Sequence, residues 1–332
     1  MQRCAVPAQE PRHDPEHDDP FPRLRRPDVL QVEDDAPVGE PGAGQVRLRH
    51  SAIGVNFIDT LFRQGAFPVP LPSVPGVEGV GVIEAVGPGV PSLRVGQRVA
   101  YYLAPGSYTQ VRLIDASALV QVPDDLDDAR VASVLTKGLT AWAGLHGYHA
   151  LAAGQTVLVQ GASSAVGGLL ARWAKALGAR VIGTAGSMAK RQALEGAIDH
   201  VLASDAPDLG AQVRALVPDG VDVVYELVGR ATFGATMAAV KDGGTIVSIG
   251  AASGAPVVDA DAMSRRGVRL VGGPMAPHLA GRLPEATAAV FQAWRSGVLG
   301  EVPYTRWPLR QAAAAHEALR DRSKQGALVL VP

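Results

Sequence analysis

The stretch VLVQGASSAVGGLLARW at residues 157–173 contains the residue types that bind a phosphate group. An apolar run enters it, small residues occupy its centre, and an amphipathic helical pattern follows. Backbone N–H groups at a helix N-terminus bind anions when no side chain blocks them. Gly161 permits the tight turn, and Gly167 and Gly168 let the helix pack closely on the sheet. Because Ser163 and Ser164 stand where glycines are common, the stretch alone fits a dinucleotide site or a plain strand-to-helix connection.

The next predicted strand, RVIGTAG at 180–186, bears on which dinucleotide would bind. Sites that prefer NAD carry an acid near the end of this strand, where it binds the adenosine ribose. Here no acid follows, and the sequence continues with Ser187, Lys190 and Arg191, which can bind a 2′-phosphate. The alternative is that Lys190 and Arg191 form the solvated face of a helix. The residue types favour the phosphate, and therefore NADPH.

The composition argues against several other classes of function. With 31 basic and 32 acidic residues, the formal net charge of −1 gives no reason to expect nucleic acid or an anionic membrane as a partner. Cys4 is the only cysteine, which excludes an internal disulfide and a cysteine-rich metal site. No apolar run has the length of a membrane span, and the N-terminus lacks the apolar core of a signal peptide. We therefore expect a cytoplasmic protein.

The elements that position these residues indicate an α/β fold with two domains. A chain of 332 residues is long for a single core. Residues 25–122 contain short alternating strands between glycine and proline turns, which predicts a β-rich, barrel-like domain. From 123 to 266 strands alternate with helices, which predicts a doubly wound parallel sheet of the Rossmann type. Residues 267–332 end in a helix and a strand that we expect to return to the first domain.

Residues 1–24 differ from the rest of the chain. They carry many charges and five prolines without apolar periodicity, which predicts a disordered tail. His13 and His17 lie among acids in this segment, and we interpret them as part of a solvated tail rather than as a metal site.

Several ordered motifs resemble those of the zinc-independent quinone oxidoreductases of the medium-chain dehydrogenase/reductase superfamily. The motifs are AIGVNFIDTLFRQG, PGVEGVGVIEAVGPGV, TKGLTAW, QGASSAVGGLLARWAKALGARVIGT, VVYELVGR and QGALVLVP. The resemblance covers essentially all of the chain except the tail, and GASSAVG looks like the dinucleotide turn of this superfamily. It implies a GroES-like catalytic domain, split in sequence around a Rossmann domain, with NADPH in the cleft.

The resemblance also implies which residues bind the cofactor. Asn56, Phe57 and Asp59 should lie near the nicotinamide, and Thr140 should also approach it. The residues expected at the pyrophosphate are Ser164, Ala165, Val166 and Gly167. Those expected at the adenosine and its 2′-phosphate are Gly186, Ser187, Lys190 and Ser204. Ile249 and Gly250 are expected at the nicotinamide end, and Arg322, near the C-terminus, is expected to reach the cofactor. Asn56 and Asp59 are the polar candidates for a catalytic role, and the alternative for both is a structural role in capping the segment NFID.

The same resemblance argues against zinc and reveals departures from the family. Zinc-dependent relatives need cysteine, histidine and acidic ligands, but Val77 stands in place of a histidine and leaves Glu78 alone. Leu61 and Phe67 stand where bacterial members often have tyrosines, so neither position offers a phenol to a substrate. The strand with which the family begins is expected to be missing or altered, because the residues directly before PDVLQV are polar and contain proline.

We therefore expect an NADPH-dependent quinone reductase that acts on a small-molecule quinone. Quinones accept electrons readily, so hydride transfer depends on positioning and exclusion of water more than on a Lewis acid. One alternative is an NADPH-dependent reductase of activated carbon–carbon double bonds, in enones or enoyl thioesters. Another is a non-catalytic NADPH-binding protein with a structural or sensing role. We also expect a homodimer, in which strand GGTIVSIG and the apolar residues after it present the edge of the Rossmann sheet.

Overall fold

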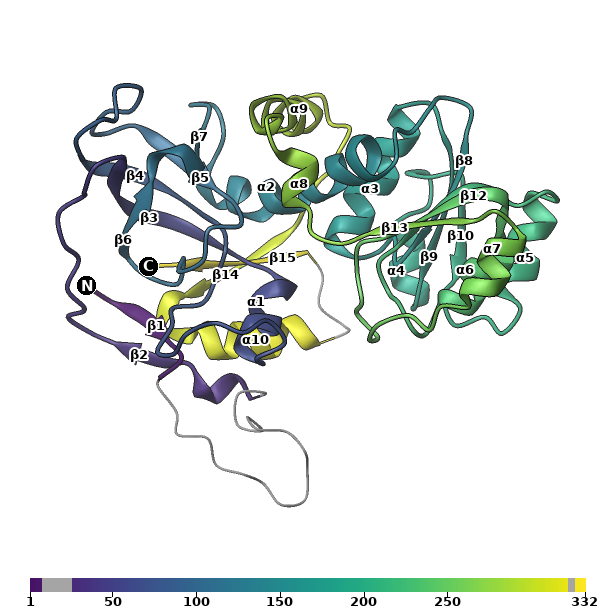
Figure 1. Ribbon diagram of the computed structural model, residues 1–332, viewed down its shortest axis with the longest axis horizontal. Coiled ribbons are helices and arrows are strands. Elements are labelled where there is room, and N and C mark those ends of the chain that lie inside the picture. Colours follow the sequence, from purple (N-terminus) through teal and green to yellow (C-terminus); the bar gives the residue numbers. More distant parts are fainter. Residues whose placement is uncertain (8–25, 322–325) are drawn as a thin grey trace, which may run out of the picture. The chain divides into compact units, whose positions relative to one another are not determined.

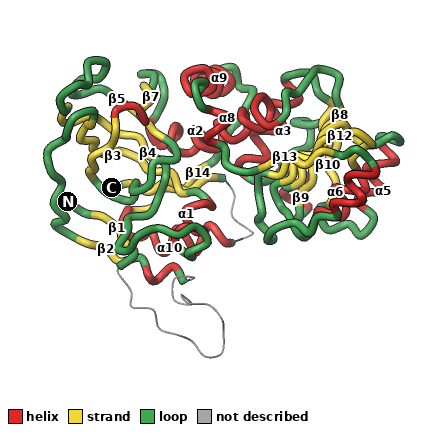
Figure 2. The backbone as a smooth tube through the Cα atoms, viewed as in Figure 1, coloured by secondary structure: helices red, strands yellow, loops and turns green. Residues whose placement is uncertain are grey.

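The chain forms two compact units, which Figures 1 and 2 show as ribbon and tube. The computed structural model describes all residues except 8–25 and 322–325. Unit 1 consists of Met1–Thr136 and Val302–Pro332, and unit 2 consists of Lys137–Glu301. The predicted α/β fold, with a doubly wound parallel sheet and a β-rich domain, is confirmed.

The boundaries of the two units differ from those expected from the sequence. Residues 123–136 group with the β-rich unit, because the segment is tied to its sheet by side-chain hydrogen bonds such as that from Thr136 N–H to Glu78. Residues 267–301 group with the Rossmann unit instead of returning to the first domain, because Arg269–Gly272 forms the sixth strand of its sheet.

Unit 1 is built on a seven-stranded sheet. Its strands are β3 (Gln45–Val55), β4 (Gly79–Val86), β5 (Arg98–Tyr101), β6 (Val111–Asp115), β7 (Leu119–Gln121), β14 (Tyr304–Pro308) and β15 (Ala327–Val331). They lie in the order β14-β15-β3-β4-β5-β7, with β6 paired to β3. The first half of β3 buries alternate residues, as its alternating sequence predicts. Strand β15 pairs antiparallel with β3, so the C-terminal strand completes the sheet.

The first strand, β1 (Arg3–Ala5), contradicts the prediction that residues 1–24 form a tail without a packed face. It pairs antiparallel with β2 (Gln31–Glu33) in a separate two-stranded sheet. Cys4, Ala5 and Val6 are each at most 2% exposed, so this short segment buries every apolar side chain that it has. A strand is therefore present before PDVLQV, but it lies at residues 3–5 and not directly before that motif.

Backbone hydrogen bonds also join this strand to loops of unit 1. The N–H of Cys4 donates to the carbonyl oxygen of Tyr108 at 2.9 Å, and Val6 and Ser73 donate to each other at 2.8 and 3.0 Å. These partners lie far along the chain, so a pattern search near the N-terminus does not detect them. The rest of the predicted tail, residues 8–24, lies outside the described residues.

Helices of unit 1 pack with these strands. They are α1 (Phe57–Arg63), α10 (Ala312–Arg320) and the 3-10 turns η2 (Pro27–Val29), η3 (Ala116–Ala118) and η5 (Leu309–Gln311). One apolar cluster includes Cys4 of β1, Tyr108, Ala315 of α10 and Leu328 of β15. The N-terminal strand and the C-terminal helix therefore share one core.

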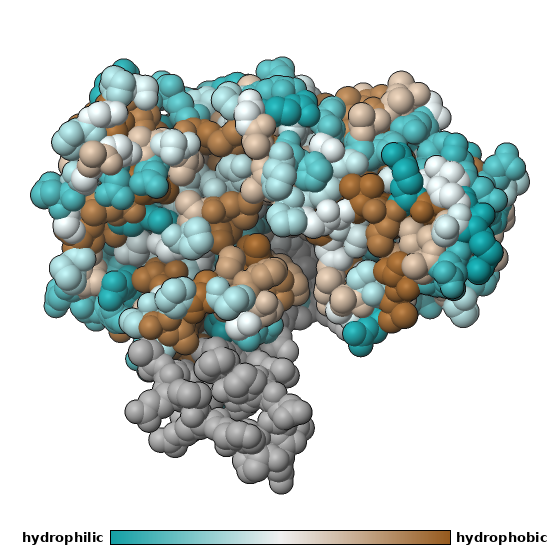
Figure 3. All heavy atoms as spheres, viewed as in Figure 1, coloured by the Kyte–Doolittle hydropathy of each residue, from teal (hydrophilic) through white to brown (hydrophobic). Residues whose placement is uncertain are grey.

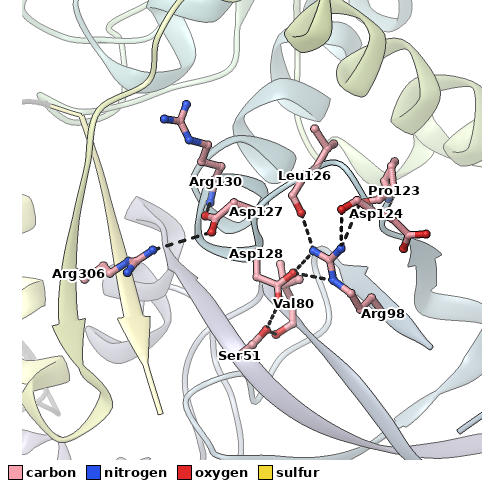
Figure 4. Close-up of polar contacts among 10 residues, drawn as sticks. All are labelled: Ser51, Val80, Arg98, Pro123, Asp124, Leu126, Asp127, Asp128, Arg130 and Arg306. Atoms are coloured by element: carbon pink, nitrogen blue, oxygen red, sulfur yellow. Dashed lines mark hydrogen bonds and ion pairs between the residues drawn. The ribbon is translucent and has the colours of Figure 1, made fainter. Parts of the chain in front are cut away.

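Helix α2 (Asp128–Ala143) begins in unit 1 and ends in unit 2. Asp127 caps it by accepting a hydrogen bond from a first-turn N–H at 3.0 Å. Figure 4 shows that Arg98 of β5 binds both the Asp128 carboxylate and carbonyl oxygens of the turn before the helix. Ser51 of β3 donates to the other Asp128 oxygen at 2.5 Å. Two strands of the sheet thus fix the first turn of α2.

Unit 2 contains a six-stranded sheet in the order β10-β9-β8-β11-β12-β13. The strands are β8 (Thr156–Gln160), β9 (Arg180–Ala185), β10 (His200–Ala203), β11 (Val221–Glu226), β12 (Val240–Ser248) and β13 (Arg269–Gly272). All neighbours run parallel. The direction of winding reverses between β8 and β11, which is where doubly wound sheets bind ligands.

Helices connect the strands of unit 2 (Figure 1). They are α3 (Ala165–Ala176), α4 (Met188–Gln192), α5 (Leu209–Leu216), α6 (Phe233–Ala239), α7 (Ala260–Arg265), α8 (Ala276–Leu279) and α9 (Leu283–Arg295), with a π-helical turn η4 (Gly144–Tyr148) after α2. Within the described ranges, no helix has both the length and the apolar character needed to cross a bilayer. On the face in view, hydrophilic residues interrupt the hydrophobic ones (Figure 3).

Candidate functional site

The turn between β8 and α3 needs glycine at two positions only. Ser164 is the N-cap of α3, and its Oγ accepts a hydrogen bond from the Gly167 N–H at 3.0 Å. Gly161 has φ of 78°, in the left-handed region that favours glycine. A Cβ on Gly167 would lie 2.3 Å from the carbonyl oxygen of Gly161, so no side chain fits there. A serine at position 164 fits this turn because its side chain caps the helix.

The first turn of α3 leaves backbone N–H groups open to a ligand. In the part of the chain that the structure describes, the N–H groups of Ala165 and Val166 have no hydrogen-bond partner, as is normal at a helix start. The Gly167 N–H is already bound to Ser164. An anion at this end would therefore meet Ala165 and Val166, and the helix dipole would favour its charge.

Four of the predicted residues come together at the carboxyl end of β9. Ser187 caps α4 by accepting a hydrogen bond from the Lys190 N–H at 3.3 Å. Ser204 follows β10, and its N–H donates to the carbonyl oxygen of Ala185 at 3.1 Å. A Cβ on Gly186 would lie 3.5 Å from Ser204 Oγ, so these two residues are neighbours. Gly186 and Ser187 are exposed, whereas Lys190 and Ser204 are half-buried.

Ile249, Gly250 and Thr140 lie after β12 and within α2. The N–H groups of Ile249 and Gly250 donate to the carbonyl oxygen of Glu226 at 3.1 and 3.2 Å. Ile249 Cδ1 lies 3.6 Å from the position that a Cβ on Gly144 would take, directly after α2. Thr140 is one helical turn before Gly144 and lies on the same side of the helix. The structure therefore brings Thr140 and Ile249 to one region of unit 2.

Asn56, Phe57 and Asp59 form the start of α1 in unit 1. The Asn56 N–H donates to Asp59 Oδ2 at 2.8 Å, which is half of a capping box. The Asn56 side chain donates to Glu78 Oε2 at 2.8 Å. Asp59 is fully buried and Asn56 is 8% exposed, whereas Phe57 is 49% exposed. This geometry favours the structural interpretation of Asp59, one of the two left open by the sequence.

A buried chain of side chains, which the sequence did not predict, continues from Asp59 to α10. The Tyr108 hydroxyl donates to Asp59 Oδ2 at 3.0 Å, and His316 Nε2 lies 2.8 Å from that hydroxyl. Arg63 Nη1 lies 2.8 Å from His316 Nδ1. Because a guanidinium only donates, Nδ1 accepts and Nε2 carries the proton that His316 donates to Tyr108. A histidine within an alanine-rich helix was the one local signal, and nothing in the sequence joins it to Tyr108.

Burial sets the protonation states in this part of unit 1. Burial, followed by the charge of Arg63, lowers the pKa of His316 to about 3. Burial, followed by the neighbouring Asp59, raises the pKa of Tyr108 well above its usual value. Burial likewise lowers the pKa of His50 to about 3, and both nitrogens of this ring have a polar partner at 2.7 Å. Both imidazoles are therefore neutral at neutral pH.

Glu78, the residue left over from a zinc-ligand pattern, binds protein groups. Its two oxygens accept hydrogen bonds from the Asn56 side chain and the Thr136 N–H, each at 2.8 Å, so it joins α1 to α2. The neighbouring Val77 is buried and offers no metal ligand. Within the described residues, no three His, Cys, Asp or Glu side chains are arranged to hold a metal ion.

The predicted residues thus fall into two groups, one in each unit. Asn56, Phe57 and Asp59 belong to unit 1, and the others that are described belong to unit 2. Arg322 lies outside the described residues. Leu61 is half-buried and Phe67 is 44% exposed, so the structure places no phenol at either position.

Comparisons with known proteins agree with this division of the chain. A family described as the alcohol dehydrogenase GroES-like domain matches residues 42–124, and one described as zinc-binding dehydrogenase matches residues 165–290. The chain is 38% identical to a 2-haloacrylate reductase from Burkholderia sp., over 91% of this chain and 95% of the relative. It is 37% identical to a quinone oxidoreductase from Pseudomonas aeruginosa, over 92% of this chain and 96% of the relative.

Solved structures give the same picture. The crystal structure of Escherichia coli quinone oxidoreductase complexed with NADPH superimposes with a TM-score of 0.90 at 30% sequence identity, over 100% of both chains. The crystal structure of a 2-haloacrylate reductase superimposes with a TM-score of 0.82 at 36% identity, over 93% of this chain and 97% of the other.

Proposed function

Because this chain belongs to the quinone oxidoreductase family of the medium-chain dehydrogenase/reductase superfamily, we propose that it reduces a quinone with NADPH and without zinc. The observation that carries this proposal is the set of groups at the carboxyl edge of the Rossmann sheet. The N–H groups of Ala165 and Val166 are open, and the second strand, β9, is followed by Ser187 and Lys190 of α4 instead of an acid. When bound, NADPH supplies the hydride, and the protein supplies orientation and exclusion of water.

Each group of residues in unit 2 has a role in this proposal. Ala165 and Val166 bind the pyrophosphate through their N–H groups, while Ser164 and Gly167 shape the turn. The residues at the end of β9 and after β10 bind the adenosine and its 2′-phosphate; these are Gly186, Ser187, Lys190 and Ser204. Thr140, Ile249 and Gly250 approach the nicotinamide. A contribution from Arg322 stays a prediction.

In unit 1, we assign Asn56 and Phe57 to the nicotinamide and the acceptor. Glu78 holds the Asn56 amide in one orientation. Asp59 acts through Asn56 as a positioning residue, because it is fully buried and its carboxylate binds the Asn56 N–H and Tyr108. Since Leu61 and Phe67 offer no phenol, the reduced quinone oxygen takes its proton from water.

Replacement of Lys190 by alanine tests the cofactor preference. We expect the wild-type protein to bind NADPH more tightly than NADH, and Lys190→Ala to weaken NADPH by about tenfold or more while NADH is little affected. The reason is that only NADPH carries the 2′-phosphate that the ammonium would neutralise. Cofactor fluorescence titration measures both affinities.

The neighbouring half-buried cation supplies a matched control. Arg191 hydrogen-bonds to Met188 in the same short helix, and Arg191→Ala removes an equal charge. It should lower NADPH affinity less than Lys190→Ala does. Equal affinities for NADPH and NADH in the wild-type protein, or tighter binding of NADH, would contradict the assignment.

A second candidate activity is the reduction of activated carbon–carbon double bonds. It is favoured by the 38% identity to a 2-haloacrylate reductase, which is similar in degree to the identity with quinone oxidoreductases. Both reactions need a hydride aimed at an electron-poor carbon or quinone, so the site described here serves either. Steady-state rates with a quinone, an enone and a 2-haloacrylate on one preparation decide between them. The quinone should give the highest kcat/KM.

We further propose a homodimer that forms at the free edge of the Rossmann sheet. The strand GGTIVSIG, expected at that edge, is the interior strand β12, and β13 lies outside it. Leu270 of β13 is 41% exposed, and Val257 in the preceding connection is 76% exposed. An exposed edge strand with apolar side chains favours pairing with a second copy. A cytoplasmic location stays a prediction.

Light scattering tests this assembly. We expect the wild-type chain to have the mass of two copies and Leu270→Lys to shift it toward one copy, because a charge on the edge opposes pairing. Val95→Lys changes a residue of unit 1 that is 62% exposed and serves as the matched control. A wild-type protein that is monomeric at micromolar concentration would disprove the dimer.

A further inference from the structure

Buried polar side chains run beneath the carboxyl edge of the sheet in unit 2. At one end, the N–H of Gly161 donates to Thr184 Oγ1 at 3.0 Å. The Thr184 hydroxyl in turn donates to Gln160 Oε1 at 2.9 Å. Because the Thr184 hydroxyl has a single proton, it accepts from Gly161 and donates to Gln160. The turn before α3 is therefore tied to side chains of both β9 and β8.

The chain continues toward β11 with the same direction of donation. Gln160 Nε2 donates to Thr236 Oγ1 at 3.3 Å, and the Thr236 hydroxyl donates to Glu226 Oε2 at 2.6 Å. Gln160 and Glu226 are the last residues of β8 and β11 and are paired in the sheet. Every hydroxyl and amide group thus passes its hydrogen bond onward until the carboxylate of Glu226 accepts the last one.

Glu226 connects this hydrogen-bonded chain to the loops that follow β11 and β12 at the same edge of the sheet. Its Oε1 accepts hydrogen bonds from the N–H groups of Val228 and Gly229 at 2.8 and 2.9 Å, which shapes the loop after β11. Its backbone oxygen accepts from the N–H groups of Ile249 and Gly250, which shapes the loop after β12. Glu226 therefore holds both the loop after β11 and the loop after β12.

Burial makes this arrangement sensitive to the loss of any member. Gln160, Thr184, Glu226 and Thr236 are all 0% exposed. A buried polar group that loses its partner cannot recover it from water, and neighbouring hydrogen bonds in a chain polarise one another. Glutamine and glutamate at the ends of otherwise apolar strands are also unusual, because nonpolar side chains would fill those positions without the need for partners.

We propose that Thr184, Gln160, Thr236 and Glu226 are positioning residues that couple the two ends of the cofactor-binding edge. They link the turn of Gly161, where the pyrophosphate would lie, to the loops after β11 and β12, where the nicotinamide would lie. The identity of the ligand rests on the proposed function. The coupling between the two ends is a property of the apoprotein and stands independently.

Amide hydrogen exchange on the apoprotein tests the coupling. Thr236→Val keeps the shape of the side chain and removes the link between Gln160 and Glu226. We expect it to speed exchange of the Gly161 N–H by about tenfold, although Gly161 does not touch Thr236. Thr184→Val removes the acceptor of that N–H directly and gives the upper limit of the effect.

Thr287→Val is the matched control. Thr287 is 5% exposed in α9, and its hydroxyl has no hydrogen-bond partner among the described residues. It should leave exchange at Gly161 unchanged. If Thr236→Val also leaves Gly161 unchanged, or if it speeds exchange uniformly across unit 2, the coupling is disproved.

Cofactor titrations supply the second readout. Thr236→Val should weaken NADPH by about tenfold and leave adenosine 2′-monophosphate unchanged, because that fragment lacks both the nicotinamide and the phosphates that would lie at the turn of Gly161. Equal weakening of both would indicate a general structural loss and would overturn the positioning role. If the wild-type protein does not bind NADPH, the proposed function fails, and the exchange experiment alone decides on the coupling.

Discussion

Deletion of residues 2–6 should destabilise unit 1 by about 3–5 kcal/mol. Ala5 of this segment is buried, and Cys4 and Val6 pack in the core that contains Tyr108. Burial of these side chains contributes about 1–3 kcal/mol each for the larger ones, and each lost backbone hydrogen bond adds about 1 kcal/mol. The N–H of Gln110 donates to the Gln2 carbonyl at 2.9 Å and would be exposed by the deletion. Urea unfolding and hydrogen exchange of the segment around Gln110 measure both effects.

Substitutions of two valines, one buried and one exposed, test whether the stability comes from the packing of the N-terminal segment. Val6 is 2% exposed, and Val32, on the partner strand, is 40% exposed. Val6→Ala should lower the free energy of unfolding by about 2 kcal/mol, whereas Val32→Ala should change it by less than about 0.5 kcal/mol. Full stability after the deletion, or equal effects of the two substitutions, would show that residues 2–6 do not pack as described.

Acid should unfold unit 1 because two neutral histidines are buried in it. The folded pKa values of His50 and His316 are about 3, against 6.5 in the unfolded chain. Between these values the unfolded chain binds protons that the folded chain does not, so stability falls as the pH drops below 6.5. Each histidine contributes a loss of about 1.4 kcal/mol per pH unit over that range. Urea midpoints recorded across this pH range measure the slope.

A variant of one of the two buried histidines identifies the source of the pH dependence. His316→Gln keeps an amide donor for Tyr108 and removes one titrating group, so it should flatten the slope by about half. Thr287→Val changes no titratable group and lies in unit 2, so it should leave the slope unchanged. A urea midpoint that is constant from neutral pH to pH 5 would contradict the neutral, buried state of both rings.

The parts of the fold that the sequence predicted are those with local signals. The strand, turn and helix around Gly161 follow one another within a short stretch. The spacing of the apolar residues and the residues typical of turns define them. Strand β1 was not predicted, because its three residues, Arg3–Ala5, are too few to show a periodic pattern and because they pair with the distant residues 31–33. Strand β13 was not predicted for a similar reason, since Arg269–Gly272 is short, largely exposed and defined by its pairing with β12.

The same distinction holds for the site. Ser164 and Ser187 were predicted from the turns in which they stand, and the structure gives both an N-cap role that explains the residue type. The hydrogen-bonded partners Tyr108 and His316 are 208 positions apart, and no local pattern links them. A buried Glu226 within the apolar run VVYELVG was a usable signal, because a carboxylate in such a strand must have several donors around it.

The central claim is that this protein passes a hydride from NADPH to a quinone without a metal ion. The most direct test mixes metal-depleted protein, after prolonged treatment with a chelator, with NADPH and benzoquinone in the absence of oxygen. The amount of NADPH oxidised, measured from its absorbance, should equal the amount of quinone consumed. The rate should be the same as before chelation, and it should be higher than the rate with NADH. Loss of the reaction after chelation, with recovery on addition of zinc, would contradict the account.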